Sequence, residues 1–180
     1  MLHRRYDGDM GATMQQKPAS VTETRPERRR LLRTLFFCYV LALVWLLFAR
    51  RAEIALGAWD HYFEAERISL VPFATIRRYL RAIRNGVVVE IALINLFGNL
   101  VLFMPMGALL PLLFPSLRRA WRFLLLQTGL LCSVEAMQLI LRCGSCDADD
   151  VILNLLGAAL AYAVCRLILW RRERSRKAAG

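Results

Sequence analysis

Apolar residues along the chain fall into four runs, each close to the ~20 residues that an α-helix needs to cross a bilayer. The runs cover residues 35–49, 87–114, 121–141 and 151–170, and arginine-rich segments separate them. The first run is short, but Leu31 and Leu32 extend it. The second is too long for a straight crossing, because a helix over residues 87–114 would measure about 42 Å. We therefore expect a kink in it at Pro105 and Gly107.

A fifth helix is predicted between the first and second spans, after Pro72. Ile76, Tyr79, Leu80 and Ile83 recur at helical spacing and share one face. The other faces carry arginines, at positions 77, 78, 81 and 84. A basic amphipathic helix of this kind lies flat in the membrane interface. The alternative is a solvated helix that packs on the bundle.

These elements predict an all-α fold, an integral membrane bundle of four transmembrane helices with an interfacial amphipathic helix between the first and second. Residues 1–34 are polar, lack apolar periodicity and are predicted to be a mobile basic tail. Residues 35–170 are predicted to form the transmembrane domain, and residues 171–180 a basic C-terminal tail. We expect no cleavable signal peptide, because the first apolar run starts too far from residue 1.

The composition agrees with a membrane protein, since 57% of the residues are hydrophobic and the mean hydropathy is +0.40. The net charge is +11, from 25 basic and 14 acidic residues. Such a charge can indicate nucleic-acid binding, but no motif for it accompanies the charge, so this partner is not expected. The basic residues flank the apolar runs, where they orient the spans in the lipid bilayer and contact anionic headgroups.

The arginine distribution predicts the orientation of the bundle. Basic residues are concentrated before the first span, in the turn at residues 118–122 and after the fourth span. Because cytoplasmic segments are enriched in Lys and Arg, we expect a multi-pass protein of the cell membrane with both termini cytoplasmic. The acidic loop 142–150 and the connection 50–86 then lie outside. Four of the seven arginines in that connection belong to the amphipathic helix, where headgroup contact explains them.

The cysteines give little indication of metal chemistry. Three of the five lie inside apolar runs, as ordinary packing residues do. Cys143 and Cys146 form a CxxC pair, which can be a redox couple or half of a zinc site. The chain has no second pair, and its only histidines are His3 and His61, so zinc is not expected. A local disulfide requires the loop to face an oxidising compartment.

Polar side chains converge where the third and fourth spans meet. Glu135 lies about 9 Å inside the outer end of the third span, and Asn154 about 6 Å inside the fourth. Asn95 reaches a similar depth, about 12 Å inside the second span. Polar groups at this depth are costly in lipid and mark functional sites, so we predict a polar pocket that opens outward. Its candidate ligand-binding residues are Asn95, Asn99, Glu135, Gln138, Asp147, Asp149, Asp150 and Asn154.

Four blocks of the sequence resemble the VanZ-like family in their order and spacing: VPFATIRRYL, NLFGNLVLFMPMG, EAMQ and DADDVILNLLGA. The resemblance covers roughly Ile68 to Tyr162. It implies a small bacterial membrane protein with several spans, whose name-giving relative is linked to tolerance of the glycopeptide antibiotic teicoplanin. Ser69 and Gly144 depart from the family pattern, in which asparagine and arginine are expected there. The matching motif positions are Pro72, Phe73, Asn95, Asn99, Phe103, Pro105, Gly107, Glu135, Gln138, Asp147, Asp149, Asp150, Asn154 and Gly157.

The first functional hypothesis is a protein that modulates the cell envelope by binding at the outer leaflet. Its ligand would be a polar headgroup, a wall precursor or a divalent cation. Asp147, Asp149 and Asp150 are the candidate metal ligands, because carboxylate oxygens suit Mg²⁺ or Ca²⁺. No other cofactor is expected.

The second hypothesis is an intramembrane enzyme that acts on a lipid-linked envelope substrate, with Glu135 as general base. The sequence favours binding over catalysis, because neither a histidine nor a serine nucleophile motif lies near the polar cluster. Transport ranks third, since it would place ionisable residues along a whole pathway.

The polar cluster also has a purely structural interpretation. Glu135 and Gln138 would bond to Asn95 or Asn99 and set the register of the helices. One aspartate, at position 149 or 150, would cap the fourth helix, because carboxylates are favoured at a helix N-terminus. Such a cap does not exclude ligand binding.

Overall fold

The computed structural model describes residues 26–49, 68–141 and 145–178. Within them, four helical segments are long and apolar enough to cross a membrane. These segments are Pro26–Ala49, Val89–Leu113, Ala120–Ile140 and Ala148–Ala178. Only 11% to 33% of each apolar window is buried inside the bundle, so most apolar side chains face outward, as in helices surrounded by lipid. The predicted all-α bundle of four spans is confirmed.

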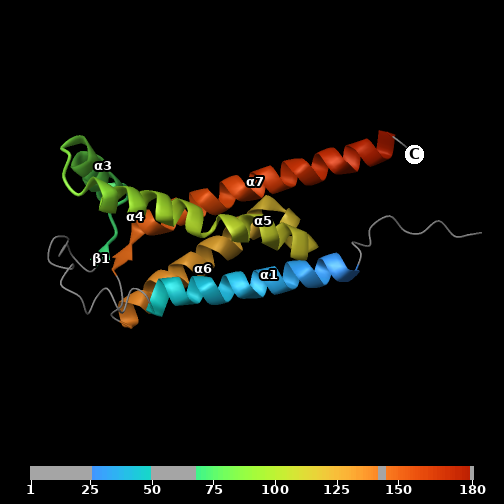
Figure 1. Cartoon of the computed structure of the whole chain (residues 1–180), viewed down its shortest axis with the longest axis horizontal. Coiled ribbons are helices and arrows are strands. Elements are labelled where there is room, and N and C mark those ends of the chain that lie inside the picture. Colours follow the sequence, from blue (N-terminus) through green and yellow to red (C-terminus); the bar gives the residue numbers. More distant parts are fainter. Residues whose placement is uncertain (1–25, 50–67, 142–144, 179–180) are drawn as a thin grey trace, which may run out of the picture.

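The first span consists of α1 (Pro26–Val44) and the π-helical turn η1 (Trp45–Ala49). It runs along the outside of the bundle and contacts α5 (Met104–Leu113) (Figure 1). Leu43 and Leu47 are its buried side chains. The hydroxyl of Tyr39 donates to the carbonyl oxygen of Leu102 at 2.9 Å, which ties α1 to the second span.

The second span is broken in two, as its length predicts. α4 (Val89–Leu102) ends at Phe103, and α5 begins at the next residue with Pro105 in its first turn. A proline fits the first turn of a helix because its missing N–H would have no partner there, so the break lies just before Pro105. Gly107 has a different role from the expected kink. A Cβ atom there would lie 2.0 Å from the carbonyl oxygen of Ala158, so this glycine permits close contact between α5 and α7.

The third and fourth spans are α6 (Ala120–Ile140) and α7 (Ala148–Ala178), and the short helix η3 (Pro115–Arg118) leads into α6. The rings of Phe123 and Tyr162 stack with centroids 4.3 Å apart, which joins the start of α6 to the second half of α7. α7 continues beyond the predicted end at residue 170 to Ala178, because its arginines and lysine are good helix formers.

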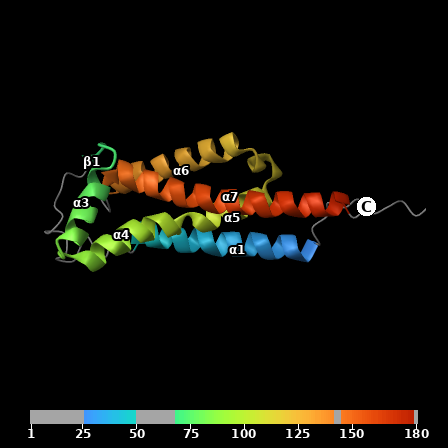
Figure 2. The same ribbon diagram turned by 90° about the horizontal axis from the view of Figure 1, so that it is seen from above.

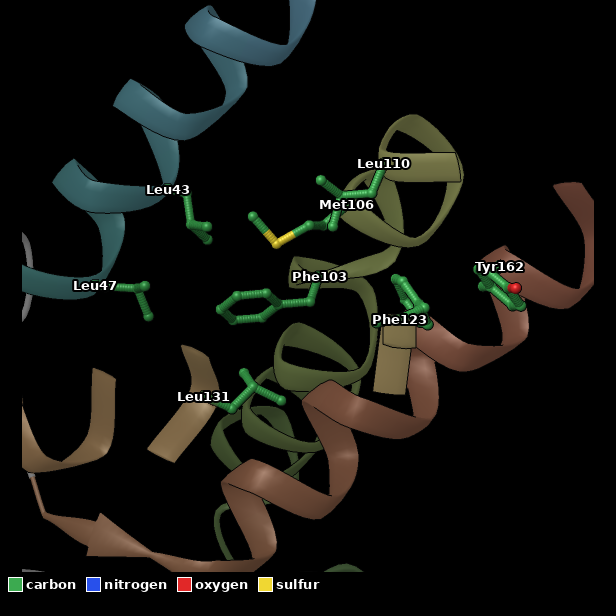
Figure 3. Packing of buried hydrophobic residues seen from close by; sticks show 9 residues of the cluster. Leu43, Leu47, Phe103, Met106, Leu110, Phe123, Leu131 and Tyr162 are labelled. Atoms are coloured by element: carbon green, nitrogen blue, oxygen red, sulfur yellow. The ribbon is translucent and has the colours of Figure 1, made fainter. Parts of the chain in front are cut away.

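The hydrophobic core lies around the break between α4 and α5. Phe103 is 1% exposed, and its ring extends toward Leu47 of η1 and Leu131 of α6 (Figure 3). Met106 extends from α5 toward Leu43 of α1 in the same view. The break therefore supplies the aromatic side chain that fills the space between three spans.

One end of the bundle is closed by α3 (Ala74–Arg84), which lies across the long helices (Figure 2). The segment before it forms strand β1 (Ile68–Ser69), which pairs in parallel with strand β2 (Cys146–Asp147) just before α7. The start of α1 and the end of α7 lie at the opposite end of the bundle (Figure 1). The fifth helix predicted from periodicity is thus confirmed, whereas the two short strands were not predicted.

Candidate functional site

The carboxylate of Asp149 caps the N-terminus of α3 from another helix. One oxygen of Asp149 accepts the backbone N–H of Phe73, and the other accepts that of Ile76 at 2.9 Å. Asp149 is fully buried, and the positive end of the α3 dipole faces its carboxylate. Phe73 has a φ of 64°, a left-handed conformation that is uncommon for an aromatic residue. The bond from its N–H to Asp149 helps to hold that conformation.

Asp147 caps α7 itself. Its Oδ1 accepts the backbone N–H of Asp149 at 2.9 Å, the bond that an N-cap side chain makes to the second residue of a helix. The prediction that Asp149 or Asp150 provides this cap was therefore wrong. α7 begins at Ala148, so Asp149 and Asp150 lie inside its first turn. Of the three aspartates, Asp147 alone precedes the helix. The backbone N–H of Asp147 in turn donates to Oε2 of Glu135 at 3.1 Å, which joins α6 to the same network.

Asp150 connects α7 to α4. The side-chain amide of Asn99, which is 8% exposed, donates to the carboxylate of Asp150. The amide of Asn154 donates to the backbone carbonyl of Asp150 at 2.8 Å. The structural interpretation paired Asn99 with Glu135 or Gln138, whereas its amide donates to Asp150 of the fourth span. The buried Oδ1 of Asn154 has no hydrogen-bond partner within the described residues.

Two other candidate residues, Gln138 and Asn95, donate to backbone carbonyls. Gln138 donates to the backbone carbonyl of Leu47 at 2.9 Å and so ties α6 to the end of the first span. Asn95 is half-buried and donates to the carbonyl of Ile91, one turn back in α4. Both amides therefore donate to backbone carbonyls, and Asn95 stabilises its own helix.

All four sequence blocks thus meet at one end of the bundle. The block before α3 supplies backbone donors, the α4 block supplies Asn99, the α6 block supplies Glu135, and the last block supplies the aspartates. A family model described as VanZ/LLP1 matches residues 36–170, three quarters of the chain.

The chain belongs to the VanZ/LLP1 family.

This assignment confirms the resemblance drawn from the four blocks. Together with the four apolar spans, it identifies a multi-pass membrane protein of the VanZ/LLP1 family. No match was found among curated proteins or among solved structures.

The carboxylates of this VanZ/LLP1 protein are directed at different partners, not at a shared point. Asp147 accepts from the start of α7, Asp149 from the start of α3, and Asp150 from Asn99. Within residues 26–49, 68–141 and 145–178, no group of three or more His, Cys, Asp and Glu side chains is placed to hold a metal ion. The hydrogen bonds of these carboxylates therefore cap the starts of α7 and α3 and join α7 to α4.

Cys146 lies beside this network, at the edge of the bundle. Burial raises the pKa of its thiol, and the nearby carboxylates of Glu135 and Asp147 raise it further. Its sulfur is a free thiol in the structure. Cys143, the other half of the predicted CxxC pair, lies outside the described residues.

The capping of α3 by an aspartate of the fourth span was not predicted from the sequence. A signal was present: Phe73 occupies the N-cap position of α3 and offers no side-chain cap. A helix start without Ser, Thr, Asp or Asn needs partners for its backbone N–H groups from elsewhere in the chain. The acidic block 147–150 contains side chains of the required kind. It lies far from α3 along the chain, however, so the pairing cannot be read from the sequence.

Proposed function

We propose that this VanZ/LLP1 protein belongs to the bacterial cell envelope and binds the polar headgroup of an envelope lipid at the end of the bundle where α3 lies. The observation that carries the proposal is the pair of hydrogen bonds that the buried carboxylate of Asp149 accepts from backbone N–H groups at the N-terminus of α3. Burying a carboxylate is costly unless it is well paired. That buried carboxylate holds α3, a basic amphipathic helix, in a fixed position. A helix of this kind lies at the membrane interface.

The charge distribution supports an outward orientation for α3. The opposite end of the bundle carries the arginines in the first turns of α1, the turn at residues 118–119 and the basic end of α7 (Figure 1). Segments this basic are retained in the cytoplasm. In the proposed orientation both termini are cytoplasmic, and α3 meets the outer leaflet, where lipid-linked wall precursors are exposed.

In this proposal most of the predicted pocket residues position α3 and its neighbours. The ligand contacts the surface of α3, which these residues hold in place. The polar network is the frame, formed by Asn99, Glu135, Asp147, Asp149, Asp150 and Asn154. Tolerance of teicoplanin, which the family resemblance implies, would follow from engagement of a lipid-linked wall precursor at this end. A divalent cation is not needed for the proposal.

The alternative of an intramembrane enzyme with Glu135 as general base stays a prediction from the sequence. Glu135 is 6% exposed, and its Oε2 accepts the backbone N–H of Asp147. This bond supports a role in holding α6 beside the start of α7.

The proposal is tested with Asp149→Asn, because an amide can accept only one of the two backbone N–H bonds through its single oxygen. We expect the variant to lose retained lipid in native mass spectrometry of the purified protein incubated with phosphatidylglycerol or a lipid-linked wall precursor. Teicoplanin tolerance of expressing cells should fall in parallel, at matched membrane levels.

The control is Glu173→Gln, which removes a carboxylate from the exposed end of α7. It should leave lipid retention and tolerance unchanged. Thermal unfolding of both variants shows whether the bundle is intact. A folded Asp149→Asn protein with the lipid profile and tolerance of the parent protein would refute the proposal.

A further inference from the structure

The outer surface of α3 contains a groove that the polar network does not use. It is lined by Arg77, Leu80, Arg81 and Arg84 and has a volume of about 520 Å³. The three arginines are spaced four and three residues apart, so they project from one face of the helix. Like charges at this spacing repel one another, and a bound anion would offset that repulsion.

Backbone contacts orient two of the guanidinium groups. Nε of Arg77 donates to the carbonyl of Phe73 at 3.0 Å, and Nε of Arg81 donates to the carbonyl of Arg77 at 3.4 Å. These bonds occupy the Nε–H of each group and leave its terminal N–H donors for a ligand. Within the described part of the chain, no carboxylate forms an ion pair with these arginines. A guanidinium group whose terminal N–H donors are available to a ligand matches the geometry of phosphate oxygens.

Apolar side chains beside the groove indicate that the ligand has a hydrocarbon part. Leu80, which lines the groove, is 54% exposed. Just before α3, Leu70, Val71 and Phe73 are also more than half exposed. Exposed apolar groups next to arginines are typical of a helix that sits at the boundary between headgroups and acyl chains. This combination favours a lipid over a free anion.

We propose that the groove of Arg77, Arg81 and Arg84 binds the phosphate group of an anionic lipid, with the acyl chain beside Leu80. This inference rests on the proposed function and names the ligand chemistry and the residues that contact it. Asp149 fixes the N-terminal turn of α3, and the arginines of the next two turns contact the lipid phosphate.

The test uses phosphatidic acid as probe and native mass spectrometry of the purified full chain to measure its dissociation constant. Arg81→Gln should weaken binding about tenfold, the effect of losing one charge-assisted bond. The triple variant R77Q/R81Q/R84Q should show no retained phosphatidic acid, and phosphatidylcholine binding should change in neither variant.

Arg78→Gln is the matched control, because it removes the same charge from the same helix but Arg78 does not line the groove. It should change the dissociation constant less than about twofold. Equal weakening by Arg78→Gln and Arg81→Gln would mean that only overall charge matters, and would overturn the groove as a site. Competition by inorganic phosphate at concentrations equal to the lipid would overturn the assignment to a lipid.

The outcomes also separate this inference from the proposed function. Loss of lipid in Asp149→Asn with full retention in the triple arginine variant would refute the groove and keep the function. Loss in the triple variant with full retention in Asp149→Asn would keep the groove and refute anchoring of α3 as the basis of function. Retention of no lipid by the folded parent protein would refute both.

Discussion

At the scale of single residues, Gln127 of α6 differs from the other buried polar side chains of the bundle. It is 1% exposed and lies one helical turn from Phe123 on one side and from Leu131 on the other, both core residues. Neither its amide nitrogen nor its carbonyl oxygen has a hydrogen-bond partner within the described residues. An unsatisfied buried amide of this kind costs about 1–3 kcal/mol.

We therefore expect Gln127→Leu to raise the free energy of unfolding by about 1–2 kcal/mol, because leucine fills most of the same space without unpaired polar atoms. Thermal unfolding in a single detergent measures the effect. Gln138→Leu is the control: Gln138 donates to the carbonyl of Leu47, so its replacement should lower the melting temperature. Destabilisation by both substitutions would show that the Gln127 amide has a partner in the folded protein.

The contacts of single residues also explain why the acidic block 147–150 does not form one pocket. Asp147, Asp149 and Asp150 occupy almost consecutive positions, yet each accepts a bond from a different part of the fold. A helical turn points neighbouring side chains in different directions. Three adjacent carboxylates in the sequence therefore need not face one ligand.

At the scale of elements, contact between α4 and α7 depends on glycine. A Cβ atom at Gly157 would lie 1.7 Å from the backbone oxygen of Leu100, so the two helices approach closer than any side chain permits. Close approach through small residues is how helices pack in lipid, where no hydrophobic force drives them together. The contact also brings Asn99 beside Asp150.

Gly157→Ala should therefore destabilise the bundle by about 1–3 kcal/mol, the usual cost of overpacking. Gly98→Ala and Gly129→Ala are matched controls in α4 and α6, because a Cβ at either position would meet nothing within 4 Å. Alanine is the better helix former by up to about 1 kcal/mol, so the controls should be neutral or stabilising. Chemical or thermal unfolding of the three variants decides the point; a Gly157→Ala protein as stable as the controls would contradict the close packing.

At the scale of the whole molecule, the proposed orientation has the end of the bundle that carries α3 facing outward. Cys146 lies at the end that carries α3, and it can report the orientation. In a variant with the other four cysteines replaced by serine, a membrane-impermeant maleimide should label Cys146 on intact cells. Labelling that requires lysis would place α3 in the cytoplasm and remove the basis for outer-leaflet binding.

The pH of the labelling reaction matters, because the pKa of Cys146 is raised by burial and by Glu135 and Asp147. Thiolate is the reactive form, so a raised pKa lowers its fraction at neutral pH. Labelling of the folded protein should be slow near pH 7 and should continue to accelerate above pH ~8.5, the usual thiol value. The unfolded protein is the control, and its rate should level off at lower pH. Identical pH profiles for the two states would show that the surroundings of Cys146 do not disfavour its thiolate.

Local patterns in the sequence predict the long helices of this protein. Apolar runs near the length of a bilayer predict four spans, because a backbone in lipid must satisfy its own hydrogen bonds in a helix. The periodicity around Ile76 and Leu80 predicts α3, and Pro105 predicts the break in the second span within two residues. Each of these signals is local, since it depends on side chains within a few turns of one another.

The partner of each polar group, by contrast, depends on tertiary packing. Asp149 accepts from backbone N–H groups 73 and 76 positions away, and a backbone N–H has no sequence signature that could reveal the pairing. The role of Gly107 was likewise undecided, because a glycine that permits a kink and one that permits close contact with Ala158 look the same in a sequence. Contacts between distant segments depend on how helices pack, and that packing is settled by the whole fold.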